Sequence, residues 1–174
     1  WVPKRNLKTD FINSYVLHSP VYPGTMLQRV WQKMEEFYDK KEVGQLGISN
    51  CYDLDVLIYL YTNARIKPSI VQNRFYAQSG YDKEIRAFCK KNAITYESFW
   101  SLTANPNILS NEVLENLANK YERSSAEIFY RFLNHINIVP LNGTTSKKHM
   151  IADLKISEFE LLPEEIAQIS NLLN

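Results

Sequence analysis

The 174-residue sequence predicts an α/β protein built on a parallel β-sheet. Five short apolar stretches alternate with longer segments in which apolar residues recur every three or four positions, the spacing of an amphipathic helix. Strands that alternate with helices pair in parallel through right-handed crossovers. The strand centres are largely apolar, which is typical of a sheet covered on both faces. We expect a single domain over residues 1–174, because no linker or low-complexity tract divides them.

Composition and charge argue against several classes of function. Apolar residues make up 45% of the chain, charged residues 22%, and the net charge is +1. A nearly neutral chain lacks the basic surface that nucleic-acid binding needs, and no apolar run approaches the ~20 residues that span a bilayer. Two cysteines, Cys51 and Cys89, are too few for a disulfide scaffold. We therefore expect a cytoplasmic protein with no membrane or nucleic-acid partner.

The first two strand–helix units lie in the N-terminal third of the sequence. Residues 11–18 are expected to form a strand, and Thr25 and Gln28 have the spacing of a capping box that opens a helix. Residues 43–49 form the second predicted strand, and Asp53 is placed to cap the next helix. The stripes expected to face the core are Leu27, Val30, Trp31, Met34, Phe37 and Tyr38 in the first helix, and Leu54, Leu57, Ile58 and Tyr61 in the second.

The third and fourth strands are predicted over residues 69–75 and 93–102. The helix between them is expected to begin at Asp82, since a carboxylate is favourable at a helix N-terminus. Its apolar face consists of Ile85, Phe88 and Cys89.

A pair of helices separates the fourth strand from the fifth. Asn111 is placed to cap the first of them, and Ser124 and Glu127 have the spacing of a capping box for the second. The fifth strand is predicted over residues 136–143, and Ser146 is expected to start the helix that follows it. The apolar stripes of the paired helices are Leu114, Leu117 and Tyr121, and Ile128, Phe129, Phe132 and Ile136.

The chain is expected to end in another helix. Pro163 suits its first position, and Glu164 and Glu165 suit its first turn, where the helix dipole favours carboxylates. The full order is therefore a strand–helix alternation with two helices before the fifth strand and two after it.

Hydrogen-bonding and aromatic residues follow the predicted strands, at the edge where parallel α/β sheets bind ligands. Amides and hydroxyls can bind a carboxamide, an aromatic ring can stack on a flat ring, and a Gly-Thr pair before a helix can hold a phosphate. These residues are His18; Ser49 and Asn50; Gln72 and Asn73; Phe99, Trp100 and Ser101; and Asn142, Gly143 and Thr144.

Each of these residues also fits a purely structural role when it is considered by itself. An isolated histidine is more often a hydrogen-bonded structural residue, and strand-end amides also satisfy loop backbone. Aromatic residues such as Phe99 and Trp100 are more often part of a core than stacking platforms. Position at the strand ends favours the ligand-binding interpretation for His18 and for Ser49 with Asn50.

Four sequence blocks resemble the aldo-keto reductases. "VLHSP" is similar to that family's "LIHWP", and "VWQKMEEFYDKKEVGQLGISNCY" resembles its tryptophan–methionine–glutamate block followed by "I-G-v-S-N-F". "PSIVQNRFY" resembles "P-x-v-N-Q-v-e-x-h-P", and "LLPEEIAQI" resembles the closing "L-s-x-E-e". The blocks agree in order and spacing, and the resemblance covers essentially the whole chain.

The resemblance implies a TIM barrel that binds NADP(H) in an extended form. Five strand–helix units fit strands four to eight of that barrel, so the expected fold is a partial TIM (β/α)8 barrel with a C-terminal helix, N-terminally incomplete. The family's catalytic tetrad is Asp, Tyr, Lys and His, of which only the histidine has a counterpart, His18. We therefore expect the chain by itself to be inactive.

The resemblance also assigns roles to individual residues. His18 corresponds to the histidine that orients the substrate carbonyl, and Phe99 falls where the family has a tyrosine under the nicotinamide. The family usually has Lys-Ser where Leu141 and Asn142 stand, although Lys147, Lys148 and His149 follow. The remaining residues expected at the cofactor are Ser49, Asn50 and Gln72 at the carboxamide, Trp100 and Leu102 beside the ring-stacking position, and Asn142, Gly143, Thr144 and His149 at the adenosine phosphates.

The function implied by the resemblance is hydride transfer between NADP, or NAD as the second candidate, and a small-molecule aldehyde or ketone. The alternative is a non-catalytic reductase-like remnant that binds cofactor or a protein partner. A partial barrel leaves strand edges unpaired, and residues 13–17 of the first strand contain no proline or lysine that would discourage pairing. Self-association through these edges is therefore expected.

Overall fold

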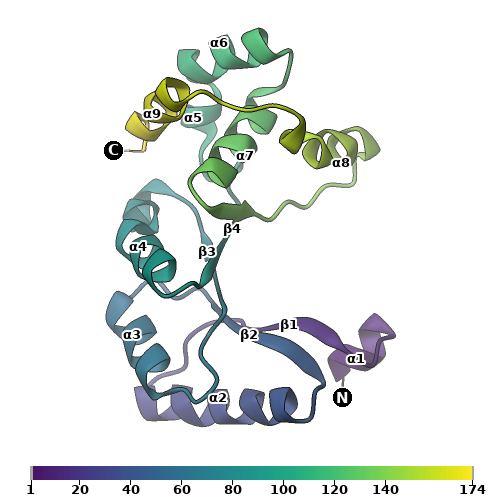
Figure 1. The fold of residues 1–174 in the computed structure, drawn as a ribbon, viewed down its shortest axis with the longest axis vertical. Helices are drawn as coiled ribbons and strands as arrows, with labels where there is room; N and C mark the ends of the chain where they lie inside the picture. The colour runs from purple at the N-terminus through teal and green to yellow at the C-terminus, as the bar shows by residue number, and fades with distance from the viewer. Residues whose placement is uncertain (1, 174) are drawn as a thin grey trace. The chain divides into compact units, whose positions relative to one another are not determined.

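The computed structural model describes residues 2–173 and divides into two compact units. The first unit is the chain up to Asn73 together with Glu84–Tyr96, and the second is Arg74–Lys83 together with the chain from Glu97 onward. Five strands join in the order β1-β2-β3-β4-β5, so each strand neighbours the next one in the sequence. Figure 1 shows helices between successive strands, as the α/β prediction requires. The single domain over residues 1–174 stays a prediction.

The strands of the first unit pair in parallel, which confirms the predicted sheet type. Tyr15 lies beside Leu46 in the β1–β2 pair, and Ile48 lies beside Val71 in the β2–β3 pair. Each strand falls within one residue of its predicted ends: β1 is Ile12–Leu17, β2 is Val43–Ser49 and β3 is Ile70–Arg74.

Four helices accompany these strands. Within the first unit, α2 packs on β2 and on α3 (Figure 1). The short α1 was not predicted, whereas α3 begins as expected because the Asp53 carboxylate accepts hydrogen bonds from the N–H groups of Asp55 and Val56. The helices are α1 (Val2–Leu7), α2 (Gly24–Asp39), α3 (Leu54–Asn63) and α4 (Lys83–Lys91).

The start of α2 differs from the prediction. The helix begins at Gly24, and no side chain caps it, so the capping box of Thr25 and Gln28 is wrong. The carbonyl of Pro23 accepts hydrogen bonds from the N–H groups of Met26, at 2.8 Å, and Leu27, at 3.3 Å. The backbone of the Pro-Gly turn therefore starts the helix one residue early.

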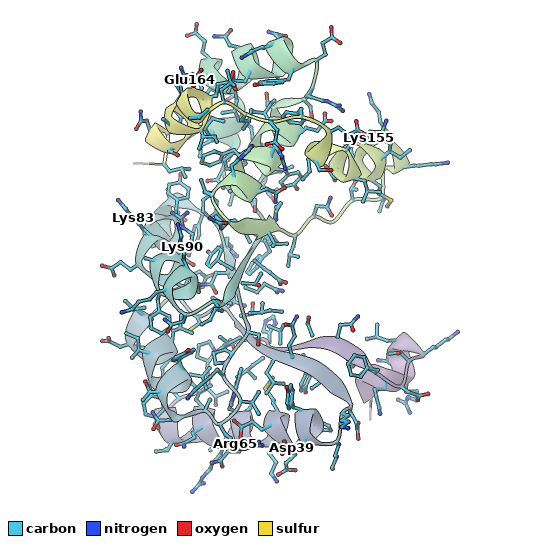
Figure 2. All side chains as sticks on the ribbon, in the orientation of Figure 1. Asp39, Arg65, Lys83, Lys90, Lys155 and Glu164 are labelled. Atoms are coloured by element: carbon cyan, nitrogen blue, oxygen red, sulfur yellow. The ribbon has the colours of Figure 1, made fainter. Side chains whose placement is uncertain are left out.

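A buried carboxylate replaces one expected apolar contact on α2. Glu35 is buried and accepts hydrogen bonds at 2.8 Å from the backbone N–H groups of Arg65 and Ile66, whereas Tyr38, predicted to face the core, is exposed. Figure 2 shows Arg65 beside Asp39, with which it forms an ion pair at 2.7 Å. The hydrogen bond with Asp39 raises the pKa of Arg65. These contacts fix the loop between α3 and β3 against α2.

The last two strands, β4 and β5, are shorter than predicted. β4 (Thr95–Phe99) ends before Trp100, whose backbone turns at φ +57°. β5 (Ile138–Pro140) has three residues, because the preceding helix extends through His135 and ends with Ile136 as its cap. The apolar pattern of the sequence therefore overestimated the lengths of β4 and β5.

The helices of the second unit pack around α7. The capping box of Ser124 and Glu127 is present at its start, and Phe129 on its inner face lies 6.4 Å, centroid to centroid, from Phe75. The helices are α5 (Pro106–Leu109), α6 (Glu112–Tyr121), α7 (Ser125–His135), α8 (Lys147–Leu154) and α9 (Pro163–Asn171), with short 3-10 segments η1 (Ala77–Asp82) and η2 (Ile156–Glu158).

Candidate functional site

Side-chain hydrogen bonds join the carboxyl end of β2 to the end of β1 and to the middle of β3 in the first unit. The Asn50 Nδ2 atom donates to the carbonyl oxygen of His18 at 2.8 Å, and the Ser49 hydroxyl donates to the carbonyl of Gln72 at 2.7 Å. Ser49 is buried, whereas the His18 side chain is exposed. Three of the predicted site residues therefore follow or end β1 and β2, and Gln72 lies beside Ser49 in the middle of β3, with the imidazole of His18 accessible.

Asn73 supports these strand ends from inside the unit. Its Oδ1 atom accepts from the Cys51 N–H at 2.9 Å, and its Nδ2 atom donates to the Cys51 carbonyl at 2.8 Å. The side chain is fully buried. Asn73 therefore fixes the segment that follows β2, a role that its strand-end position in the sequence did not distinguish from ligand binding.

A cavity of about 530 Å³ lies in the second unit, among α7, α8 and the loop that follows β5. Its volume falls within the usual range for a small-molecule site. Five residues predicted at the cofactor line it: Leu102, Asn142, Gly143, Thr144 and His149. The remaining lining residues are Glu122, Arg123, Ser124, Ala126, Glu127, Tyr130, Lys148, Ala152 and Asp153.

Two of the three acidic residues that line this cavity, Glu127 and Asp153, have side-chain partners. Glu127 accepts hydrogen bonds from Ser124 and forms an ion pair with Arg123 at 3.4 Å. The Asp153 carboxylate accepts a hydrogen bond from the Asn142 amide. Lys148 and His149, which also line the cavity, are exposed. The lining therefore presents Lys148, His149 and amide groups to a ligand, together with the exposed carboxylate of Glu122.

The loop from Asn142 to Ser146 has a defined conformation at the start of α8. The Ser146 N–H donates to Thr144 Oγ1 at 3.1 Å, and the Ser146 hydroxyl accepts from the His149 N–H at 3.4 Å. A Cβ atom on Gly143 would meet nothing within 4 Å, so the backbone there is open to an approaching group. Backbone N–H groups of the first helical turn can bind an oxyanion.

Tyr130 has a perturbed ionisation at the wall of this cavity. Burial, and secondarily the charge of Asp153, raise the pKa of Tyr130 to about 12. Both side chains, together with Asn142, also line an adjoining hollow of about 370 Å³. Tyr130 and Asp153 were not predicted as site residues, because no local sequence motif marks them.

Phe99 and Trp100 are not among the described residues that line the cavity. Phe99 ends β4, is half-buried, and accepts a backbone hydrogen bond from Phe75 at 3.3 Å. Trp100 is 58% exposed, with the Arg74 guanidinium carbon 4.3 Å from its ring centroid. A stacking role for either ring on the cofactor stays a prediction.

Outside these two hollows, the first unit has a further hollow that contains none of the predicted site residues. It measures about 290 Å³ and lies between α2 and α3. Among residues 2–173, no cluster of His, Cys, Asp and Glu could hold a metal ion. No helix in that range combines the length and the apolar character needed to cross a membrane.

Comparisons with known proteins find relatives that align with nearly the whole chain. The chain is 29% identical to the glyoxal reductase of Bacillus subtilis over 167 residues, which covers 95% of the chain and 58% of that relative. It is 28% identical over 182 residues to the NADPH-dependent alpha-keto amide reductase of Saccharomyces cerevisiae, covering 97% and 57% respectively. The chain therefore spans less than two thirds of the length of these relatives.

Solved structures share the fold. An aldo-keto reductase enzyme from a Medee basin deep-sea metagenome library superposes with a TM-score of 0.90 at 24% identity, over 99% of this chain and 63% of that one. An aldo/keto reductase of Brucella melitensis superposes with a TM-score of 0.88 at 21% identity, over 99% and 65%. The family model of the aldo/keto reductases matches residues 4–174, and the chain belongs to the aldo/keto reductase family.

Proposed function

We propose that the chain is the cofactor-binding part of an NAD(P)H-dependent aldo-keto reductase, with the architecture of a partial (β/α)8 barrel. Family membership supports the reaction type. The names of two relatives support the substrate class, since one is a glyoxal reductase and the other an NADPH-dependent alpha-keto amide reductase. The proposed substrate is a small molecule with an aldehyde or ketone group.

The observation that carries the proposal is the cavity of the second unit. It brings together five residues chosen from the sequence for cofactor contacts, His149 among them, and the cationic side chain of Lys148. We propose that Asn142, Gly143 and Thr144 hold the adenosine phosphates through amide, backbone and hydroxyl groups. The Lys148 ammonium group of the same cavity favours the additional phosphate of NADPH over NADH.

The strand ends of the first unit supply the groups proposed for the nicotinamide and the carbonyl. Ser49, Asn50 and Gln72 would hold the carboxamide, and Phe99, Trp100 and Leu102 would lie beside the cofactor. His18 would orient the substrate carbonyl with its exposed imidazole. The bound cofactor supplies the hydride, and the protein supplies binding and orientation.

Reduction of a carbonyl needs a proton donor, and no residue of this sequence matches the one that the family uses. No residue of the chain corresponds to the family's tyrosine acid or to its lysine. We therefore propose that the chain binds cofactor without reducing carbonyls by itself, and the alternative of a non-catalytic remnant rests on the same observation.

The test is oxidation of NADPH in the presence of a panel of aldehydes and ketones. We expect no oxidation above background for the purified chain, together with measurable NADPH binding. Oxidation that disappears in His18→Ala would contradict the proposed lack of turnover and would identify the chain as an enzyme. Absence of NADPH binding would contradict the proposal as a whole.

A further inference from the structure

An asparagine followed by a glycine, Asn142 and Gly143, lies in the irregular loop between β5 and α8. The sequence contains five glycines, and only Gly143 follows an asparagine. Asparagine is thermolabile, because the backbone nitrogen of the next residue can attack its side-chain amide carbon. A glycine at the next position has no side chain to hinder this attack. Asn142 is therefore the asparagine of the sequence at which this attack is least hindered.

The local structure leaves the attacking nitrogen and the amide accessible. Asn142 and Gly143 are both exposed. The Gly143 N–H donates no hydrogen bond to any described residue, so its nitrogen is not held by a backbone partner. A Cβ atom on Gly143 would meet nothing within 4 Å, which shows open space around the peptide bond that has to move.

The hydrogen bonds that anchor this loop lie on either side of the pair. Before it, the Leu141 N–H donates to the Ser98 carbonyl at 2.7 Å. After it, the Ser146 N–H donates to Thr144 Oγ1 at 3.1 Å. Neither bond restrains the peptide group that joins the asparagine to the glycine, so this group keeps the freedom of an exposed loop.

The Asn142 side chain belongs to the cavity of about 530 Å³. Its amide donates a hydrogen bond to the carboxylate of Asp153, which also lines that cavity. If the amide became a carboxylate, this donor would be lost and two carboxylates would face each other, an unfavourable arrangement. The cavity would also gain a negative charge at the position proposed to hold a cofactor phosphate.

We propose that Asn142 is a site of spontaneous deamidation, and that its conversion weakens the binding of anionic ligands in this cavity. The Gly143 nitrogen loses its proton to hydroxide and forms a bond to Cγ of Asn142, the Cγ–Nδ2 bond breaks, and ammonia leaves. Water then opens the cyclic imide at either carbonyl, which gives aspartate or isoaspartate. The net reaction consumes water and releases ammonia, with no oxidation or reduction. The modification is independent of the proposed function, whereas its effect on NADPH binding rests on that function.

Peptide mass spectrometry of the purified chain, incubated in mildly alkaline buffer at physiological temperature, tests the modification. The peptide containing Asn142 should gain the mass difference between an NH₂ and an OH group, and should do so more slowly in mildly acidic buffer. Asn13 is the internal control, because it is exposed and precedes the small residue Ser14 but lies within β1, which is paired with β2. Asn13 should stay unmodified over the same period.

Gly143→Ala is the matched variant. Space for its Cβ atom is present, and the backbone of Gly143 is outside the left-handed region, so the variant should fold. Its methyl group hinders the attack on Asn142, and deamidation should be severalfold slower than in the wild type. Equal rates in the two proteins, or equal modification of Asn13 and Asn142, would overturn the proposed site.

Calorimetric titration with NADPH measures the consequence. Incubated wild type and freshly prepared Asn142→Asp should both bind NADPH about tenfold more weakly than fresh wild type, because of one added negative charge. Incubated Gly143→Ala should keep the affinity that the same variant has when fresh. Deamidation without any loss of affinity would overturn the proposed weakening.

The outcomes separate this inference from the proposed function. NADPH binding by a chain in which Asn142 stays unmodified would overturn the inference and leave the function intact. Deamidation confined to Asn142, in a chain that binds no NADPH even when fresh, would support the modification site and refute the function.

Discussion

The Asn50 side-chain amide donates a hydrogen bond of 2.8 Å to the backbone carbonyl of His18. Asn50 directly follows β2 and His18 directly follows β1, so one side chain joins the ends of two paired strands. Asn50 adopts φ +52°, a left-handed conformation that asparagine tolerates better than most residues. The backbone carrying the imidazole is therefore held by its neighbouring strand.

Asn50→Ala should lower the free energy of unfolding by about 1–2 kcal/mol, because it removes this hydrogen bond and places alanine at a positive φ. Asn50→Gly lacks the amide but accepts the conformation, and should cost less than alanine. Urea unfolding of the three proteins measures the difference. Equal stability of all three would show that the hydrogen bond makes no net contribution.

Asn73→Ala should lower the free energy of unfolding by roughly 2–4 kcal/mol, since it leaves both backbone groups of Cys51 buried without this partner. Asn73→Asp is the matched control, because it keeps one acceptor of similar shape but loses the donor. Thermal unfolding should rank the wild type above both variants. An alanine variant as stable as the wild type would mean that Asn73 is not the support described.

Glu165 should make the fold sensitive to acid. Burial alone would raise its pKa, but hydrogen bonds from Lys120, Tyr121 and the Leu162 N–H hold that pKa below its usual 4.5. A carboxyl whose pKa is depressed by folding stabilises the protein above its unfolded pKa, and this stability is lost as pH falls through the folded pKa. Stability should therefore decline below about pH 4.5.

The control for this acid transition is Glu165→Gln, which keeps the shape of the side chain and removes its charge. The variant should be less stable than the wild type at neutral pH, and the difference should shrink as pH falls below the usual glutamate pKa. Unfolding measured by circular dichroism from neutral to acidic pH follows both proteins. A stability difference that stays constant with pH would contradict the assignment to Glu165.

The purified chain should self-associate. β1 stands at one end of the strand order, with a neighbour on one side only among the described residues, and its backbone therefore presents unpaired ladder groups. Val16→Lys should reduce association, because a charge within an edge strand opposes pairing with another strand. Light scattering of fresh samples compares the two. A wild-type chain that is monomeric at all concentrations would refute this expectation.

Local signals in the sequence specified much of the fold. The strand at 43–49 was predicted to the residue, and Asp53, Asn111 and Ser124 cap helices as expected, because cap chemistry depends on neighbours within three residues. The errors arose where backbone geometry decided the outcome. Pro23 set the start of α2, and the positive φ of Trp100 ended β4 early, a conformation that the identity of a tryptophan does not signal.

The candidate site was predictable only in part. Asn142, Gly143 and Thr144 were predicted because ligand-binding residues often come directly after a parallel strand, and such positions can be read from the sequence. Five of the predicted residues line the same cavity. The hydrogen bond from Asn105 to the Phe75 carbonyl and the raised pKa of Tyr130 beside Asp153 were missed, since these partners lie 30 and 23 positions away in the sequence.

Titration of the purified chain with NADPH tests the central claim most directly. Saturable binding is predicted, tighter than that of NADH, and Lys148→Gln at the cavity should weaken NADPH binding about tenfold. Lys155→Gln, at the far end of α8 (Figure 2), should bind NADPH as the wild type does. Failure of NADPH to saturate the chain, or equal affinities for the wild type and Lys148→Gln, would contradict the cofactor site proposed for this cavity.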